Sequence, residues 1–174
     1  LFKKNQIKVK VLVTGNLGYI GSVLTEVLSK NNIDFVGYDT GYFEDCLLYE
    51  VDNNFSQIKK DIRDINEDDL KNINTIIHLS ALSNDPLGEF NSKITKEINY
   101  QATINLANLA KKNEVKRFIY ISSQSMYGIS NSTSELDEYD SEKNPVTEYA
   151  KTKWQAEIEL NKLNDRNFSV VSLR

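Results

Sequence analysis

The chain has 174 residues, the length of about one domain, and its 40% hydrophobic and 26% charged residues are ordinary for a globular protein. The net charge of −4 excludes a general nucleic-acid binder, and a single histidine excludes a metal site built on a histidine pair. One cysteine, Cys46, excludes an internal disulfide, and no apolar run is long enough to cross a membrane. We expect a cytoplasmic protein with no metal, nucleic-acid or membrane partner, and with Cys46 as a buried or half-buried thiol.

The first predicted element is a buried strand, because β-branched valines alternate along Val9–Val13. Three glycines follow at a spacing of three: Gly15, Gly18 and Gly21. The first permits a tight turn, the second lets the backbone approach a ligand, and the third lets the next helix pack closely on the sheet. That amphipathic helix, Ile20–Lys30, directs its N-terminal N–H groups, at Tyr19 and Ile20, toward a pyrophosphate. The stretch predicts a dinucleotide-binding turn rather than a purely structural one.

The second predicted strand, Asp34–Asp39, ends in a carboxylate. Asp39 follows the third glycine by 18 residues, where an acidic residue hydrogen-bonds the adenosine ribose in a dinucleotide-binding unit. A carboxylate there repels the 2′-phosphate of NADP, and the neighbouring Thr40 supplies no cation to offset the repulsion. The sequence therefore favours NAD over NADP, with a merely solvated Asp39 as the alternative.

Residues 41–56 predict an irregular connection, followed by a third short strand over Ile58–Ile62 and a short helix over Asp68–Lys71. Asp61 can accept a hydrogen bond from an adenine amino group, and Ile62 can lie against the adenine ring.

A fourth strand, Thr75–Leu79, is followed by two small residues, Ser80 and Ala81, that let a cofactor lie against the backbone. His78 falls inside this strand, and we expect it to be a packed or hydrogen-bonded core residue. The rest of the chain continues the pattern: a helix over 90–113, a strand over Val115–Ile121, a polar loop over 129–144, a helix from Pro145 to Leu163 and a strand over Phe168–Leu173. Such alternation predicts an α/β fold, a doubly wound parallel sheet of the Rossmann type with helices on both faces.

The helix predicted from Pro145 carries two candidates for proton transfer. Tyr149 and Lys153 are four residues apart and share one helix face. A tyrosine acts as a base only where its phenolate is stabilised, which a lysine ammonium and a positive nicotinamide ring can do. The phenolate can then take a proton from a sugar hydroxyl while hydride leaves to NAD. Two hydroxyls, Ser122 and Ser123, follow the preceding strand. Ser123 can hydrogen-bond the same oxygen, whereas Ser122 is expected to be structural; an exposed helical Tyr–Lys pair is the alternative.

Together these motifs resemble the extended branch of the short-chain dehydrogenase/reductase superfamily, and most closely its NAD-dependent nucleotide-sugar epimerases and dehydratases, such as the UDP-glucose 4-epimerases. The resemblance runs from Val9 to Arg174. It rests on motifs in the family's order and spacing: Thr14-Gly15-x-x-Gly18-x-x-Gly21, Asp61-Ile62, His78-Leu79-Ser80-Ala81, Asn99, Ser123-x-x-x-Tyr127-Gly128 and Tyr149-x-x-x-Lys153.

The resemblance implies roles for particular residues. It makes Ser123, rather than Ser122, the catalytic hydroxyl beside Tyr149 and Lys153, and Lys153 a holder of the nicotinamide ribose. The implied NAD-binding residues are Gly15, Gly18, Tyr19, Ile20, Gly21, Asp39, Asp61, Ile62, Leu79, Ser80, Ala81, Asn99, Tyr149 and Lys153. The candidates for contacts to a nucleotide-sugar substrate are Ser83, Asn84 and Ser125. The resemblance also implies a homodimer through the helices around Asn99 and Tyr149, to which Ile104, Trp154 and Leu160 would add apolar surface.

The sequence departs from the family in two respects. The family's dehydratases place an Asp-Glu pair after the catalytic hydroxyl, where this chain has Gln124 and Ser125, which cannot eliminate water by acid–base catalysis. The family's smaller substrate domain would follow Arg174, and the chain starts at Leu1 with Met126 as its only methionine. We therefore interpret residues 1–174 as the NAD-binding Rossmann domain of a longer protein.

These observations predict the NAD-binding portion of a nucleotide-sugar epimerase that acts by transient hydride transfer to NAD. A nucleotide-sugar reductase or dehydrogenase of the same superfamily, and a non-catalytic NAD-binding protein, are the alternatives. We expect residues 1–174 to bind NAD but to turn over no nucleotide sugar alone, because positioning of the substrate is worth about 7–11 kcal/mol.

Overall fold

The structure is a computed structural model that describes residues 9–46, 55–83, 85–129 and 135–174. Six parallel strands form one sheet in the order β3-β2-β1-β4-β5-β6. Their bounds are β1 Lys10–Thr14, β2 Asp34–Asp39, β3 Ser56–Lys59, β4 Thr75–His78, β5 Arg117–Ile121 and β6 Ser169–Leu173. The predicted Rossmann-type doubly wound sheet is thereby confirmed.

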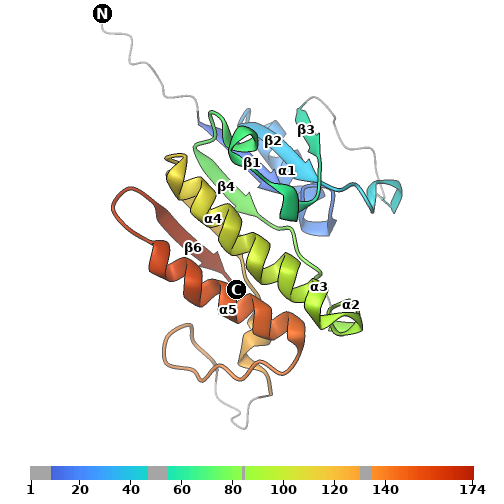
Figure 1. Ribbon diagram of the computed structural model, residues 1–174, viewed down its shortest axis with the longest axis vertical. Helices are drawn as coiled ribbons and strands as arrows, with labels where there is room; N and C mark the ends of the chain where they lie inside the picture. Colours follow the sequence, from blue (N-terminus) through green and yellow to red (C-terminus); the bar gives the residue numbers. More distant parts are fainter. Residues whose placement is uncertain (1–8, 47–54, 84, 130–134) are drawn as a thin grey trace, which may run out of the picture.

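Helices cover both faces of the sheet (Figure 1). They are α1 Tyr19–Lys30, α2 Asp85–Phe90, α3 Ser92–Lys96, the π-helix η4 Glu97–Ala102, α4 Thr103–Lys112 and α5 Glu148–Leu163. The larger core lies between the sheet and the α4–α5 layer, and includes Leu12, Phe118 and Leu160. A smaller core joins the opposite face to α1 through Leu28. Among the described residues, no helix is long and apolar enough to span a bilayer.

The strand order reverses at β1, which pairs with β2 on one side and β4 on the other. In parallel α/β sheets a ligand-binding crevice forms outside the carboxyl ends of the strands at such a switch point. The segments that follow β1, β2, β4 and β5 all begin at this edge. The topology therefore gathers most of the residues singled out from the sequence along one rim.

Several predicted boundaries were wrong because polar side chains redirect the backbone. The third strand ends at Lys59, since the Asp61 carboxylate accepts from the Arg63 N–H and caps the 3₁₀ helix η2, Ile62–Asp64. The helix predicted from Pro145 begins instead at Glu148, where the Thr147 hydroxyl accepts from the Ala150 N–H. The short helix predicted over 68–71 is the 3₁₀ helix η3, Glu67–Leu70.

The long helix predicted over 90–113 is divided. The side chain of Asn91 accepts from the Ile94 N–H and starts α3 as a new helix after α2. The π-helix η4 then inserts a wider turn before α4. Wider turns of this kind occur frequently at functional sites, and this one contains Asn99.

Helix α1 packs differently from its apolar pattern. The helical spacing of its apolar residues would bury Val23 and Val27, yet these side chains remain about half exposed, at 51% and 49%. The buried residues of α1 are Gly21, Ser22, Thr25 and Leu28. Small residues on this face let the helix backbone approach the glycine turn, so close contact with the turn decides which face is buried.

Candidate functional site

The turn after β1 is held by backbone contacts. Gly15 has a φ of +74° and donates its N–H to Tyr38 O at 2.8 Å. A Cβ at Gly15 would lie 2.7 Å from Ser80 N and 2.9 Å from the carbonyl carbon of Leu79. A Cβ at Gly21 would overlap the carbonyl oxygen of Gly15. The turn thus has no room for side chains at these two glycines, and it lies directly against the end of β4.

Gly18 occupies the N-cap of α1 and has no side chain that could cap the first turn. A Cβ there would lie 3.3 Å from Gly15 O, which is close but not an overlap. The next two residues, Tyr19 and Ile20, are 91% and 55% exposed. The helix N-terminus therefore opens to solvent at the rim, as an approach to phosphate oxygens requires.

Asp39 lies where the sequence predicts it, at the carboxyl end of β2. Its Oδ2 accepts from the Leu17 N–H at 3.2 Å and its Oδ1 from the Gly41 N–H at 2.9 Å. The carboxylate is half-buried and joins the end of β2 to the glycine turn. It is therefore a fixed acceptor beside the turn rather than a solvated strand-end residue.

At the predicted adenine end of the site, the side chains of Asp61 and Ile62 both have partners within the chain. The Asp61 carboxylate is engaged by Arg63, whose Nη2 donates to Oδ2 at 2.8 Å. These hydrogen bonds hold the pKa of Asp61 below its usual range. Ile62 is only 5% exposed and belongs to the main core. Its side chain packs in the main core, and a contact of this residue with an adenine ring stays a prediction.

His78 is a core residue, as predicted. Thr14 Oγ1 lies 2.6 Å from Nδ1, and Thr103 Oγ1 lies 2.8 Å from Nε2. Thr103 donates its own hydroxyl proton to Asn99 O, so its oxygen accepts from Nε2–H. Burial and the charge of Lys153 lower the pKa of His78 to about 3, so the ring is neutral at pH 7. The imidazole joins β1, β4 and α4.

Asn99 holds the segment that follows β4. Its Oδ1 accepts from the Leu82 N–H at 2.8 Å and its Nδ2 donates to Leu82 O at 3.1 Å. The side chain is 1% exposed. Asn99 therefore fixes the backbone just beyond Ser80 and Ala81, which are half-buried at the rim.

The α5 residues lie over the end of β5. Lys153 is 3% exposed; its Nζ donates to Ile121 O at 2.7 Å and lies 4.7 Å from the centre of the Tyr120 ring. Burial lowers the pKa of Lys153 to about 7. Tyr149, one helical turn before Lys153, is half-buried against α2. A Cβ added to Gly88 of α2 would lie 3.3 Å from the Cβ of Tyr149.

Ser123 caps the 3₁₀ helix η5, Gln124–Tyr127. Its hydroxyl donates to Ser125 Oγ at 3.0 Å and accepts from the Ser125 N–H at 3.1 Å. The predicted catalytic hydroxyl is therefore held in place by a local turn. Of the candidate substrate residues, Ser125 is half-buried, Ser83 is exposed, and Asn84 lies outside the described residues.

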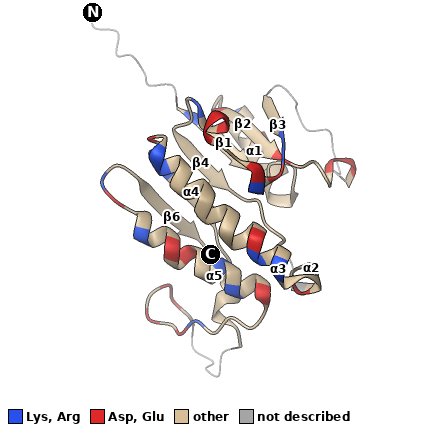
Figure 2. Cartoon of the chain, in the orientation of Figure 1, with Lys and Arg blue, Asp and Glu red and all other residues tan. Residues whose placement is uncertain are grey.

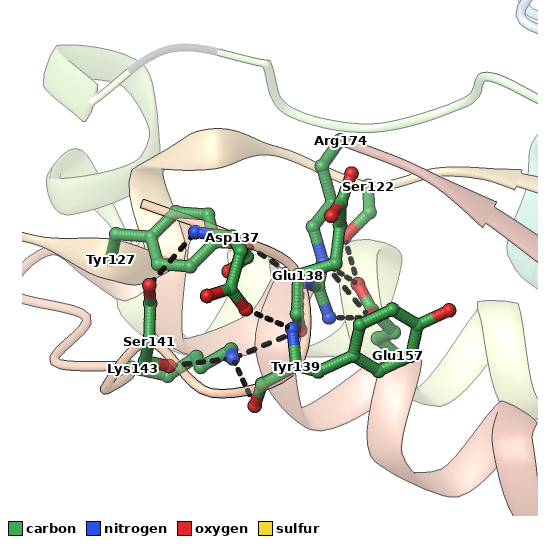
Figure 3. Close-up of polar contacts among 9 residues, drawn as sticks. All are labelled: Ser122, Tyr127, Asp137, Glu138, Tyr139, Ser141, Lys143, Glu157 and Arg174. Atoms are coloured by element: carbon green, nitrogen blue, oxygen red, sulfur yellow. Dashed lines mark hydrogen bonds and ion pairs between the residues drawn. The ribbon is translucent and has the colours of Figure 1, made fainter. Parts of the chain in front are cut away.

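Sequence reasoning missed a buried polar cluster at the end of β5 and β6 (Figure 3). Ser122 Oγ donates to Glu157 Oε2 at 2.7 Å, and Arg174 Nη2 donates to Glu157 Oε1 at 2.5 Å. The one available signal was that Glu157 follows Lys153 by four residues and so shares its helix face. Also missed was the buried Asn16, whose Nδ2 donates to Gln57 Oε1 at 2.8 Å.

One other expectation concerns a residue away from this rim. Cys46 is exposed, so the prediction of a buried or half-buried thiol was wrong. It ends the 3₁₀ helix η1, Glu44–Cys46, whose three side chains all face solvent. Within the described ranges, no group of three His, Cys, Asp or Glu side chains could hold a metal ion.

The comparisons with known proteins agree with this architecture. Residues 11–174 match the NAD dependent epimerase/dehydratase family, and the chain belongs to it. MoeE5, solved in complex with UDP-glucose and NAD, is 29% identical with a TM-score of 0.81 over 95% of this chain and 53% of that protein. UDP-glucuronic acid 4-epimerase from Bacillus cereus, solved with NAD, is 27% identical with a TM-score of 0.79 over 95% and 55% of the two chains.

A curated relative, ADP-L-glycero-D-manno-heptose-6-epimerase of Brachyspira hyodysenteriae, is 29% identical over 94% of this chain and 53% of its own length. The chain spans about half the length of this relative and of two relatives from Methanocaldococcus jannaschii.

Proposed function

We propose that residues 1–174 form an NAD-binding unit that belongs to a nucleotide-sugar epimerase. The observation that carries the proposal is the shared rim: the glycine turn packs directly on the end of β4, and Lys153 is hydrogen-bonded to the end of β5. In this proposal the pyrophosphate lies over the glycine turn, the adenosine ribose lies at Asp39, and the nicotinamide half lies toward Tyr149 and Lys153. The NAD bound to MoeE5 and to the Bacillus cereus epimerase supports the choice of cofactor.

The chemistry follows from the groups around α5. NAD, when bound, supplies the hydride acceptor. Tyr149 would take the proton of a sugar hydroxyl as the base while hydride leaves to NAD, and would return the proton when the hydride returns to the sugar. Ser123, held by the Ser125 N–H that its hydroxyl accepts from, would turn its one hydroxyl proton from Ser125 Oγ to the same sugar oxygen. Lys153 orients the nicotinamide ribose and favours the phenolate form of the tyrosine by its positive charge.

The reaction class follows from what stands after Ser123. Gln124 and Ser125 offer no carboxyl group for an elimination of water. We therefore favour epimerisation, with a nucleotide-sugar reductase or dehydrogenase as the second candidate. A non-catalytic NAD-binding protein is the third, and it needs no tyrosine and lysine on one helix face.

We also propose a homodimer through α4 and α5. Figure 2 shows no charged residue along the middle of α4, and residues Thr103–Ala110 contain none. Ile104 and Trp154 are half-buried and can extend across such an interface. Leu160, which we expected to add apolar surface, is completely buried in the core and contributes none. Light scattering over a range of concentrations tests the proposal, and a constant monomer mass contradicts it.

Calorimetric titration of residues 1–174 with NAD tests the central proposal. We expect NAD to bind, and UDP-glucose to be left unconverted by this chain alone, because the groups that would retain a nucleotide sugar are proposed to lie outside it. No binding of NAD would refute the proposed function. Rapid conversion of the sugar would show that the substrate site lies within these residues.

The role of Tyr149 is testable in a form of the protein extended to the length of its relatives. Tyr149→Phe should lower kcat by roughly 10²–10⁴, the usual worth of a general acid–base group. Affinity for NAD should change little, because the glycine turn and Lys153 remain. Tyr139→Phe is the matched control, since the Tyr139 side chain is 90% exposed. Equal activity of the two variants would remove Tyr149 from the mechanism.

A further inference from the structure

The buried cluster missed by sequence reasoning has Glu157 at its centre. The Glu157 and Arg174 side chains are only 7% and 15% exposed. One carboxylate oxygen accepts from Ser122 Oγ at 2.7 Å, and the other accepts from Arg174 Nη2 at 2.5 Å and Nε at 3.2 Å. Both oxygens are therefore satisfied, as a buried carboxylate requires.

Helix α5 uses two successive turns to hold two consecutive residues. Lys153 donates to Ile121 O, and Glu157 accepts from the hydroxyl of Ser122, the next residue. Ser123 follows directly and caps η5. The position of the proposed catalytic hydroxyl relative to α5, which also carries Tyr149, is thus fixed through Glu157.

Arg174 extends the same cluster to the segment that leads into α5. Its Nη1 donates to Tyr127 Oη and to Glu138 O, both at 2.7 Å. Tyr127 Oη in turn donates to Asp137 O at 3.0 Å. Figure 3 shows these groups converging on Arg174 from the turn after β5, from residues 137–138 and from α5. Four N–H groups of one guanidinium therefore join three separate stretches of chain.

Gly128 shows how closely this segment packs on the turn after β5. It has a φ of +64°, and a Cβ there would overlap Asn144 O. The two ends of the connection between η5 and α5 are consequently in contact. Arg174 contacts Tyr127, the residue before Gly128, and Glu138 within the same connection.

We propose that Glu157 and Arg174 are positioning residues of the active site: their ion pair holds Ser122, and through it Ser123, in register with Tyr149. This inference rests on the proposed function for the role of Ser123 and Tyr149, whereas the positioning itself is a property of the chain. It predicts a local loss of order at 122–128 and 137–138 when the pair is broken, with the glycine turn unaffected.

Hydrogen exchange of residues 1–174, read by mass spectrometry or NMR, tests the proposal. Glu157→Gln keeps the size of the side chain and one acceptor but loses the charge. We expect the Ser125 and Gly128 amides to exchange at least tenfold faster, and the amides of β1 and α1 to stay within twofold. Glu159→Gln is the control on the same helix, because Glu159 pairs only with the exposed Lys162 in the described structure.

A second variant separates charge from geometry. Arg174→Lys keeps the positive charge but cannot reach Glu157, Tyr127 and Glu138 together. Arg174→Lys should raise the local amide exchange rates to within about threefold of those in Glu157→Gln. The fluorescence of Trp154 should also change, since its ring lies 5.8 Å from the Arg174 guanidinium and it is the only tryptophan in the sequence. Full rescue by lysine would overturn the geometric role. A uniform increase over all slow amides would also overturn it, because it would show a merely global effect on stability.

Titration with NAD distinguishes this inference from the proposed function. Bound NAD should slow exchange at Ser125 in the natural chain but not in Glu157→Gln, while it protects the glycine turn in both. Equal protection of Ser125 in both proteins would refute the positioning role. No binding of NAD by the natural chain would refute the proposed function, yet the local exchange measured without NAD would still decide whether Glu157 orders Ser123.

Discussion

The two ends of the proposed site are held by different means. Around Gly15 and Gly21 the main chain packs on the main chain, and no side chain could be added without overlap. Around Ser123 the chain is held by long-range side-chain contacts, from Lys153 to Ile121 and from Glu157 to Ser122 and Arg174. The glycine turn should therefore be sensitive to added side-chain volume. The α5 end should respond to charge and pH.

The largest expected difference concerns Lys153. Its lowered pKa, about 7, means that between pH 7 and 10.5 the unfolded chain keeps a proton that the folded chain releases. Stability should therefore rise with pH in this window, by about 2 kcal/mol between pH 7 and 9 at 1.36 kcal/mol per pH unit. Below pH 7 the full cost of burying the ammonium is present.

Urea unfolding at several pH values measures this slope, and Lys153→Met should abolish it. His78 does not interfere, because its pKa is lowered to about 3 and its window lies below pH 6.5. A slope that persists in the methionine variant would assign it to another group.

The glycine end should respond next most strongly. In Gly21→Ala the new Cβ would lie 2.6 Å from Asn16 Cα and overlap Gly15 O, so the helix or the turn must shift. We expect a loss of about 1–3 kcal/mol in the free energy of unfolding. Gly18→Ala is the matched comparison, because its nearest contact would be 3.3 Å. Gly18→Ala should lower the free energy of unfolding by less than about 1 kcal/mol and should act mainly on the affinity for NAD. Equal thermal stability of the two variants would contradict the close packing of α1 on the turn.

A smaller, electrostatic effect at the glycine end is expected from Asp39, on the choice between NAD and NADP. The natural chain should bind NAD about tenfold more tightly than NADP, because the carboxylate repels a 2′-phosphate. Asp39→Asn keeps the shape and one acceptor for the Leu17 or Gly41 N–H, and should narrow this ratio. Titration of both proteins with both cofactors measures it. Equal affinity of the natural chain for NAD and NADP would remove Asp39 from the ribose site.

The smallest effect concerns Tyr120, beneath Lys153. Among the described residues its hydroxyl is the one buried side-chain polar atom without a hydrogen-bond partner. Tyr120→Phe removes this unsatisfied group and retains the ring below the lysine ammonium. We expect stabilisation by about 1 kcal/mol, measured as a rise in melting temperature. Destabilisation would mean that the hydroxyl has a bound partner, such as an ordered water.

The sequence-based predictions were accurate where structure is local and less accurate where it depends on side-chain contacts. The element order, the parallel sheet and the position of the glycine turn could be predicted, because periodicity and glycine spacing are local properties of the chain. The bounds of β2 were correct to the residue. The third strand and the start of α5 were misplaced because Asp61 and Thr147 cap short turns, and a cap changes the path of the chain without changing its hydrophobic pattern.

The arrangement of the candidate site could also be predicted only in part from the sequence. Gly15, Asp39, Tyr149 and Lys153 could be placed at one rim from their positions after strands and along one helix. The hydrogen-bond partners of Asp61, Asn99 and Ser123 could not be predicted from the sequence. They are Arg63, Leu82 and Ser125, and these pairings depend on the folded geometry rather than on a sequence pattern.

By itself the sequence determined the family, the doubly wound sheet and the residues that reach its carboxyl edge, because strand and helix periods and fixed spacings are written in consecutive residues. Only the tertiary structure decided that Glu157 and Arg174 join Ser122 to α5, and that Ile62 and Leu160 are core rather than surface. The physical reason is distance along the chain: a hydrogen bond between residues 35 apart, as for Ser122 and Glu157, depends on how β5, β6 and α5 pack together. No local pattern records that packing.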